Sequence, residues 1–115
     1  MMFNRLGISE TDREPMPALT VLELTLKAVE AQDGLIHMQQ IERDVAGRPI
    51  GYCAMGAFAA ENPNNCINAK LAFQIQEQND SYPHATPRQR RQYMIAWLNK
   101  RILQERSNPS RLLPT

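Results

Sequence analysis

Thiol and imidazole groups are the side chains of this sequence best suited to act directly on a substrate. Cys53 stands at the expected start of a helix, where the helix dipole and free backbone N–H groups favour a reactive thiolate, and His84 would serve as its base. A cysteine within a run of Ala, Gly and Met is, however, typical of a small buried hydrophobic residue. A Cys/His enzyme is therefore the third-ranked function, and we expect no enzyme and no catalytic residue.

The same residue types are also the ones that bind zinc. Cys53, Cys66, His37 and His84 are all suitable ligands, but no two of them stand at the short spacings that a chelating turn requires. The sequence also lacks the glycine-rich loops that hold phosphate cofactors. We therefore expect neither a metal ion nor a cofactor.

Basic residues collect in the last quarter of the chain. The segment 88–111 holds seven basic residues and one acidic residue, a net charge of +6, whereas residues 1–87 hold six basic and eleven acidic residues, a net charge of −5. Such an uneven distribution indicates an acidic body with a basic C-terminal helix. It is the main electrostatic feature of the sequence.

This basic helix is the predicted binding element. Arginine and tryptophan are favoured anchors of protein interfaces, so the first-ranked partner is a protein with an acidic surface. Nucleic acid is the alternative, because several arginines can follow phosphates while an aromatic side chain stacks on a base. A helix-turn-helix is disfavoured, since the would-be recognition helix 66–78 carries only one basic residue, Lys70. The predicted binding residues are Arg88, Arg90, Arg91, Trp97, Lys100 and Arg101.

The elements that position these residues are mostly helical. Abundant Leu, Ile, Ala and Met with 6% aromatic residues predict a mainly α fold, a compact bundle of about four helices. We expect a flexible arm over residues 1–16, one helical domain over 17–106 and a polar tail over 107–115. Residues 35–50 predict an irregular or hairpin excursion, with residues 44–47 at its tip.

Helix ends are marked by specific spacings. Thr20 and Glu23 have the spacing of a capping box, and Asp33-Gly34 predicts the end of that first helix. A third helix is expected from about Cys66 to Gln78. Thr86, Pro87 and Gln89 predict the start of the last helix, which should run to about Arg106.

The segment 52–61 is expected to be the buried centre of the fold. Read as a helix, it places the small residues Cys53, Gly56, Ala57 and Ala60 along one stripe, where another backbone can approach closely.

This segment carries a family resemblance. Tyr52-Cys53-Ala54-Met55-Gly56-Ala57-Phe58, preceded by Gly47-Arg48-Pro49-Ile50 and followed by Asn79-Asp80 before a capped helix, resembles an uncharacterised family of small bacteriophage and bacterial proteins. Those proteins have a Cys-Ala-Leu-Gly-Ala-Leu-like segment, a later Asn-Asp pair and a final amphipathic helix. The resemblance covers roughly Thr20 to Leu103, and this chain departs from it at Met55, Phe58 and the insert Ser81 to His84. It implies a phage or bacterial origin and a helical fold, and it brings no activity.

Together these features lead to one expected function. The protein is expected to be a small phage- or bacterium-encoded accessory protein that modulates or inhibits a host protein by non-catalytic binding. The start of the chain lacks a secretory signal, no apolar run approaches the roughly 18 residues of a membrane span, and two cysteines are few for a disulfide scaffold. We therefore expect it in the bacterial host cytoplasm, with no membrane partner.

Overall fold

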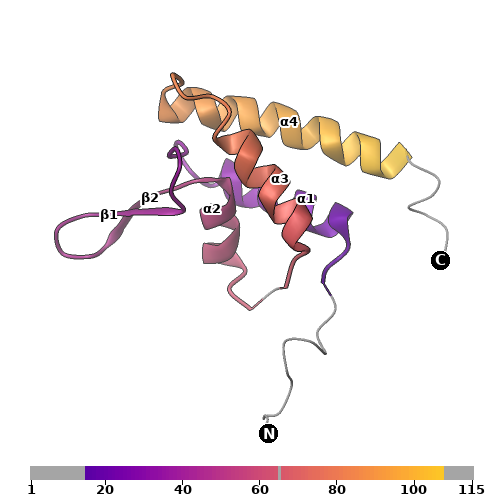
Figure 1. The fold of residues 1–115 in the computed structure, drawn as a ribbon, viewed down its shortest axis with the longest axis horizontal. Coiled ribbons are helices and arrows are strands. Elements are labelled where there is room, and N and C mark those ends of the chain that lie inside the picture. Colours follow the sequence, from indigo (N-terminus) through magenta and orange to yellow (C-terminus); the bar gives the residue numbers. More distant parts are fainter. Residues whose placement is uncertain (1–14, 65, 108–115) are drawn as a thin grey trace, which may run out of the picture.

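The computed structural model describes residues 15–64 and 66–107. This part of the chain is mainly helical, with four helices and one small antiparallel sheet (Figure 1), which confirms the predicted fold class. The elements are α1 (Ala18–Glu30), β1 (Ile41–Arg43), β2 (Pro49–Tyr52), α2 (Ala54–Glu61), α3 (Ala69–Asn79) and α4 (Pro87–Ser107). Nearly all of the predicted arm, residues 1–14, and of the predicted tail, residues 108–115, lies outside the described residues. No helix of the described part is long and apolar enough to cross a membrane.

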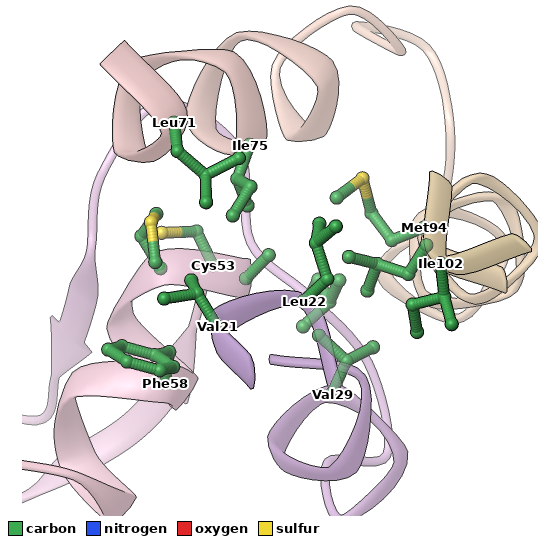
Figure 2. Close-up of a cluster of buried hydrophobic side chains, with 13 residues drawn as sticks. Val21, Leu22, Val29, Cys53, Phe58, Leu71, Ile75, Met94 and Ile102 are labelled. Carbon is green, nitrogen blue, oxygen red and sulfur yellow. The ribbon is translucent and has the colours of Figure 1, made fainter. Parts of the chain in front are cut away.

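The core forms where the four helices meet. α1 packs most extensively on α4 and next on α2, while α3 covers α2 and touches α4. Apolar side chains from all four helices point into one cluster (Figure 2), and Leu22, Ile75 and Leu98 within it are fully buried. On α4, Leu98 and Ile102 are buried in this cluster, whereas Ile95 is only partly buried.

The first helix differs from its prediction at both ends. α1 begins at Ala18, so Thr20 lies inside the helix, and Glu23 forms an ion pair with Arg106 of α4. The predicted capping box is wrong because the N-cap is Pro17, three residues before Thr20, and the Val21 N–H bonds to the Pro17 carbonyl to close the first turn. The helix ends at Glu30, before the predicted stop at Asp33-Gly34.

The later helix starts follow local capping rules. In α4 the Thr86 N–H donates to Gln89 Oε1 over 2.9 Å and the Gln89 N–H donates to Thr86 Oγ1 over 3.1 Å, so the predicted capping box is confirmed. α3 begins at Ala69, later than predicted, because the Asn68 side chain accepts the N–H groups of Lys70 and Leu71.

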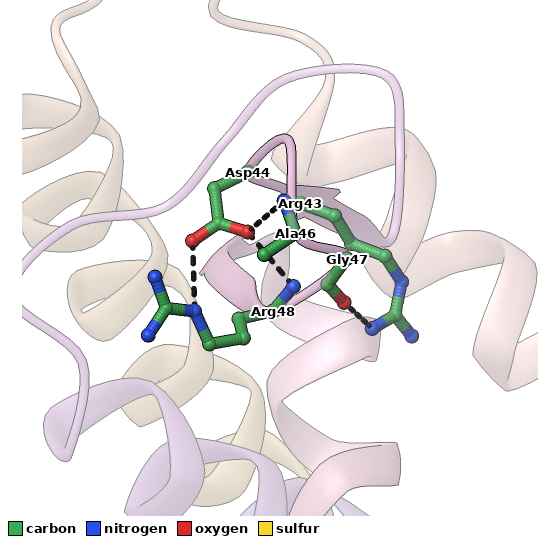
Figure 3. A network of polar contacts seen from close by, with 5 residues as sticks. All are labelled: Arg43, Asp44, Ala46, Gly47 and Arg48. Atoms are coloured by element: carbon green, nitrogen blue, oxygen red, sulfur yellow. Dashed lines mark hydrogen bonds and ion pairs between the residues drawn. The ribbon is translucent and has the colours of Figure 1, made fainter.

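The excursion over residues 35–50 contains a hairpin. β1 and β2 pair antiparallel with an irregularity between Glu42 and Arg43. At the tip, Asp44 Oδ1 accepts the N–H groups of Ala46 and Arg48 and Asp44 Oδ2 lies 3.1 Å from Arg48 Nε (Figure 3). Gly47 supplies the positive φ of 83° that the turn needs. The hairpin alternative and its predicted tip are confirmed.

The start of α2 is held against the segment that precedes the hairpin. Cys53, Gly56 and Ala57 are buried as predicted, whereas Ala60 is exposed and does not belong to the packed stripe. A Cβ added at Gly56 would lie 1.9 Å from the carbonyl oxygen of Gln40. The close backbone approach predicted for the stripe therefore occurs at Gly56.

Gly56→Ala is expected to destabilise the protein even though alanine is the better helix former by roughly 1 kcal/mol. The added methyl collides with the Gln40 carbonyl, which is backbone and yields only if the loop moves; we expect a net loss of about 1–3 kcal/mol in the free energy of unfolding. Urea denaturation measures it. Ala60→Gly on the same helix should cost only the propensity difference, and a Gly56→Ala protein more stable than the parent would contradict the close approach.

Candidate binding surface on α3 and α4

Arg90, one of the predicted binding residues, lies in the interior. Its side chain is only 3% exposed. Nη1 donates to the Leu35 carbonyl over 3.0 Å, and Nη2 donates to the carbonyls of Tyr82 and Ala85 over 2.7 and 3.3 Å. Burial holds the pKa of Arg90 below its usual value, and the nearby Asp80 carboxylate offsets part of this effect. The assignment of Arg90 to a binding surface is wrong, because its donors face the interior.

Arg91 also binds within the chain. Its Nε donates to the Gln32 carbonyl over 2.6 Å and its Nη2 donates to the Glu30 carbonyl over 2.9 Å. These carbonyls lie at and just beyond the end of α1, where an α-helix leaves its last acceptors unsatisfied. Arg91 thus stabilises the C-terminal end of α1.

The other predicted residues lie on two different flanks of α4. Arg88 and Trp97 are nine positions apart, about two and a half helical turns, so they face nearly opposite directions. Arg88 is exposed, and it lies about one turn before Arg91, which binds the end of α1. Arg101 lies on the flank toward α3, where it reaches Gln74, and Trp97 contacts Arg101 there. Lys100, next to Arg101 in the chain, is exposed.

Trp97 and Arg101 form a stacked pair. They are one turn apart, and the Arg101 guanidinium carbon lies 5.3 Å from the centre of the indole ring, within the range of a cation–π interaction. Arg101 Nη1 also donates to Gln74 Oε1 of α3 over 3.4 Å. Both side chains are partly exposed, so the pair is held in place and still reaches the surface.

Lys70 joins this surface although the sequence analysis did not select it. It lies one turn before Gln74 on α3, and both residues border a hollow of about 420 Å³ that also reaches Arg101. The polar lining residues of the hollow are Asn68, Lys70, Gln74 and Arg101, and its apolar lining residues are Met16, Ala18 and Leu71. The four-residue spacing of Lys70 and Gln74 indicated a shared helix face. The packing of α4 beside that face had no local signal. We call Lys70, Trp97, Lys100 and Arg101 the basic surface.

The cations of the basic surface lack acidic partners in the described part of the chain. Within residues 15–64 and 66–107 the ion pairs are Arg48 with Asp44 and Arg106 with Glu23. Neither pair involves a residue of the basic surface, and no carboxylate lines the hollow. These cations are therefore not neutralised by an ion pair within the described residues.

The Cys53 thiol lies in the interior, whereas a nucleophilic thiol must be accessible to its substrate. It is fully buried, donates to Gln76 Oε1 over 3.1 Å and accepts the Gly56 N–H over 3.3 Å, which caps α2. Burial raises the pKa of Cys53, although the hydrogen bonds from the α2 backbone lower it. His84 is exposed, and no contact joins it to the thiol.

An Asn-Asp pair ties the loop before the hairpin to two helices. The Ala54 N–H at the start of α2 donates to Asn79 Oδ1 over 3.1 Å, and Asn79 Nδ2 donates to the Ile36 carbonyl over 3.0 Å. Burial would raise the pKa of Asp80, but hydrogen bonds from Gln76, the Met38 N–H and Asn79 hold it below its usual value. The pair thus has a structural use that the motif in the sequence did not reveal.

Two further features concern metal ligands and a second groove. No group of three or more His, Cys, Asp or Glu residues that could hold a metal ion occurs within the described ranges. A second groove, of about 410 Å³, runs between α2 and α3 and is lined mainly by apolar side chains, among them Met55, Phe58 and the 65% exposed Phe73.

Comparison with known proteins yields no relative: no family model, no curated protein and no solved structure matches the chain. The resemblance carried by the segment from Tyr52 to Phe58 and by Asn79-Asp80 stays a prediction.

Arg90→Met is expected to lower the free energy of unfolding by about 2–4 kcal/mol, because it leaves the carbonyls of Leu35 and Ala85 without their donor, while the Tyr82 carbonyl keeps the Ala85 N–H. Arg88→Met removes the same charge from the exposed flank of the same helix and should change stability by less than about 0.5 kcal/mol. Chemical denaturation of both variants measures the difference. Equal stability would contradict the buried position of Arg90.

Native protein treated with iodoacetamide at pH 8 is expected to be alkylated at the partly exposed Cys66, while Cys53 reacts only after unfolding. Burial blocks access, and its raised pKa leaves Cys53 less thiolate than a free thiol has at this pH. Mass spectrometry of the peptides measures both rates. A Cys53 that reacts faster than a model thiol would revive the Cys/His enzyme hypothesis.

Proposed function

We propose that this protein acts without catalysis, by binding an acidic surface of another protein through the basic surface on α3 and α4. The observation that carries the proposal is the stacked Trp97–Arg101 pair, which lies beside Lys100 and near Lys70 with no carboxylate paired to these cations in the described residues. We expect the protein to be an accessory protein, encoded by a phage or a bacterium, that binds a protein of the host.

Composition and geometry both support a protein partner. Tryptophan and arginine are enriched among the residues that dominate binding energy at protein interfaces. The stack limits the motion of Arg101 before binding, so less side-chain entropy is lost on association. The partner is expected to be acidic because like charges placed across an interface are strongly unfavourable.

Nucleic acid is a weaker alternative partner than the number of basic residues in the sequence indicates. Proteins that follow a phosphate backbone use several cations along one track. Of the arginines of α4, Arg90 and Arg91 bind carbonyls within the chain, and Arg106 is paired with Glu23. Three cations and one aromatic side chain remain together, which is a small area for that purpose.

The test is affinity capture from a nuclease-treated bacterial lysate with the parent protein and the double variant Lys100→Glu/Arg101→Glu. A partner that depends on the basic surface should be lost from the double variant, with binding weakened at least about tenfold when measured with the purified partner. Arg88→Glu adds the same kind of charge change on the other flank of α4 and should retain the partner.

Two results would overturn the proposal. One is a partner that both the parent and the double variant capture equally. The other is recovery of nucleic acid alone from untreated lysate, with nothing retained after nuclease treatment. Thermal melting of each variant shows that any loss of binding does not come from unfolding.

A further inference from the structure

We propose that the hollow between α3 and α4 is a carboxylate pocket that receives a glutamate or aspartate side chain of the acidic partner. This inference rests on the proposed function and adds to it the chemical group that is recognised. The hollow holds about 420 Å³, within the size range of pockets that enclose small ligands, and Lys70 and Arg101 are its charged lining residues.

The two cations offer complementary kinds of donor. Arginine presents a planar fork that binds both oxygens of a carboxylate at once, while lysine acts as a compact point charge. Arg101 comes from α4 and Lys70 from α3. Ala18 at the start of α1 and Met16 just before it also line the hollow, so the pocket depends on the packing of these three helices. The Gln74 amide, one turn after Lys70, borders the same space with a further N–H₂ donor.

The Arg101 guanidinium is oriented by Trp97, and its hydrogen bond to Gln74 is long. Trp97 supports the face of the guanidinium at 5.3 Å. The bond from Arg101 Nη1 to Gln74 Oε1 is 3.4 Å long. This is longer than the roughly 2.7–3.2 Å of an ordinary N–H···O hydrogen bond. An incoming carboxylate replaces this weak contact by shorter, charge-assisted bonds.

The surroundings reinforce the preference for an anion with a short apolar stem. Neither α1 nor α3 has an acidic residue in its first turn, and Ala18 and Lys70 of these turns border the hollow. The partial positive charge of both helix starts therefore adds to that of the side chains. Met16 and Leu71 give the hollow an apolar side on which the methylene groups of a glutamate can pack.

The pocket is tested by NMR titration of the ¹⁵N-labelled full chain with a blocked tetraglutamate peptide, with tetraglutamine as the uncharged control. Tetraglutamate should shift the amide signals of Lys70 and Leu71, the Gln74 side-chain amide and the Trp97 indole. Lys70→Gln should weaken this binding about tenfold, in line with one lost hydrogen bond between charged groups. Arg88→Gln should bind as the parent does.

Equal binding of tetraglutamate by the Lys70→Gln protein, or shifts confined to other parts of the chain, would overturn the pocket. So would inorganic phosphate or a short oligonucleotide that shifts the same signals at lower concentration than the peptide, since the site would then prefer phosphate.

The outcome is separable from that of the proposed function. A captured partner that is lost from Lys100→Glu/Arg101→Glu but retained undiminished by Lys70→Gln leaves the proposed function standing and removes the pocket. A partner retained by the double variant removes the proposed function even where tetraglutamate binds in the hollow.

Discussion

A buried guanidinium is the interaction on which the arrangement of this protein depends. Arg90 joins α4 to the carbonyls of Leu35, Tyr82 and Ala85, which belong to the loop after α1 and the loop after α3. Burying a charged group is costly unless its donors find acceptors. Nη1 and Nη2 find them in these two loops, whereas the buried Nε has no hydrogen-bond partner among the described residues. The bonds of Nη1 and Nη2 therefore hold the two loops against α4. Arg91 adds the end of α1 to the same assembly. The packing of α1 on α4 therefore has a polar contribution beside its apolar one.

The second junction lies at the start of α2. Asn79 binds both the Ala54 N–H and the Ile36 carbonyl, Cys53 caps the helix, and Gly56 admits the Gln40 carbonyl. Each contact is made by a small or polar side chain, because the loop before the hairpin lies directly against the helix. This is why the segment that most resembles an active site in the sequence serves here to join the loop to α2 and α3.

The use of arginines inside the fold determines what remains for binding. Arg90, Arg91 and Arg106 satisfy groups of the same chain, so the high positive charge of the last quarter overstates what a partner meets. Trp97, Lys100 and Arg101 remain on the flank toward α3, and Lys70 extends their charge across the hollow. The candidate surface is thus smaller than the sequence indicated, and it draws on two helices.

By itself, the sequence determined the features that arise from local physics. The helical fold class, the capping box of Thr86 and Gln89 and the turn at Asp44–Gly47 all depend on residues close in the chain. The small residues of the segment 52–61 also predicted a tight backbone approach, but only the fold identified its partner as the Gln40 carbonyl, from before the hairpin. The sequence also identified Trp97, Lys100 and Arg101 as members of a possible interface.

Only the tertiary structure decided which arginine faces the interior, because Arg88, Arg90 and Arg91 are chemically alike and differ only in direction around α4. It likewise added Lys70, since the meeting of α3 with α4 depends on core packing between segments about thirty positions apart, which no local pattern encodes.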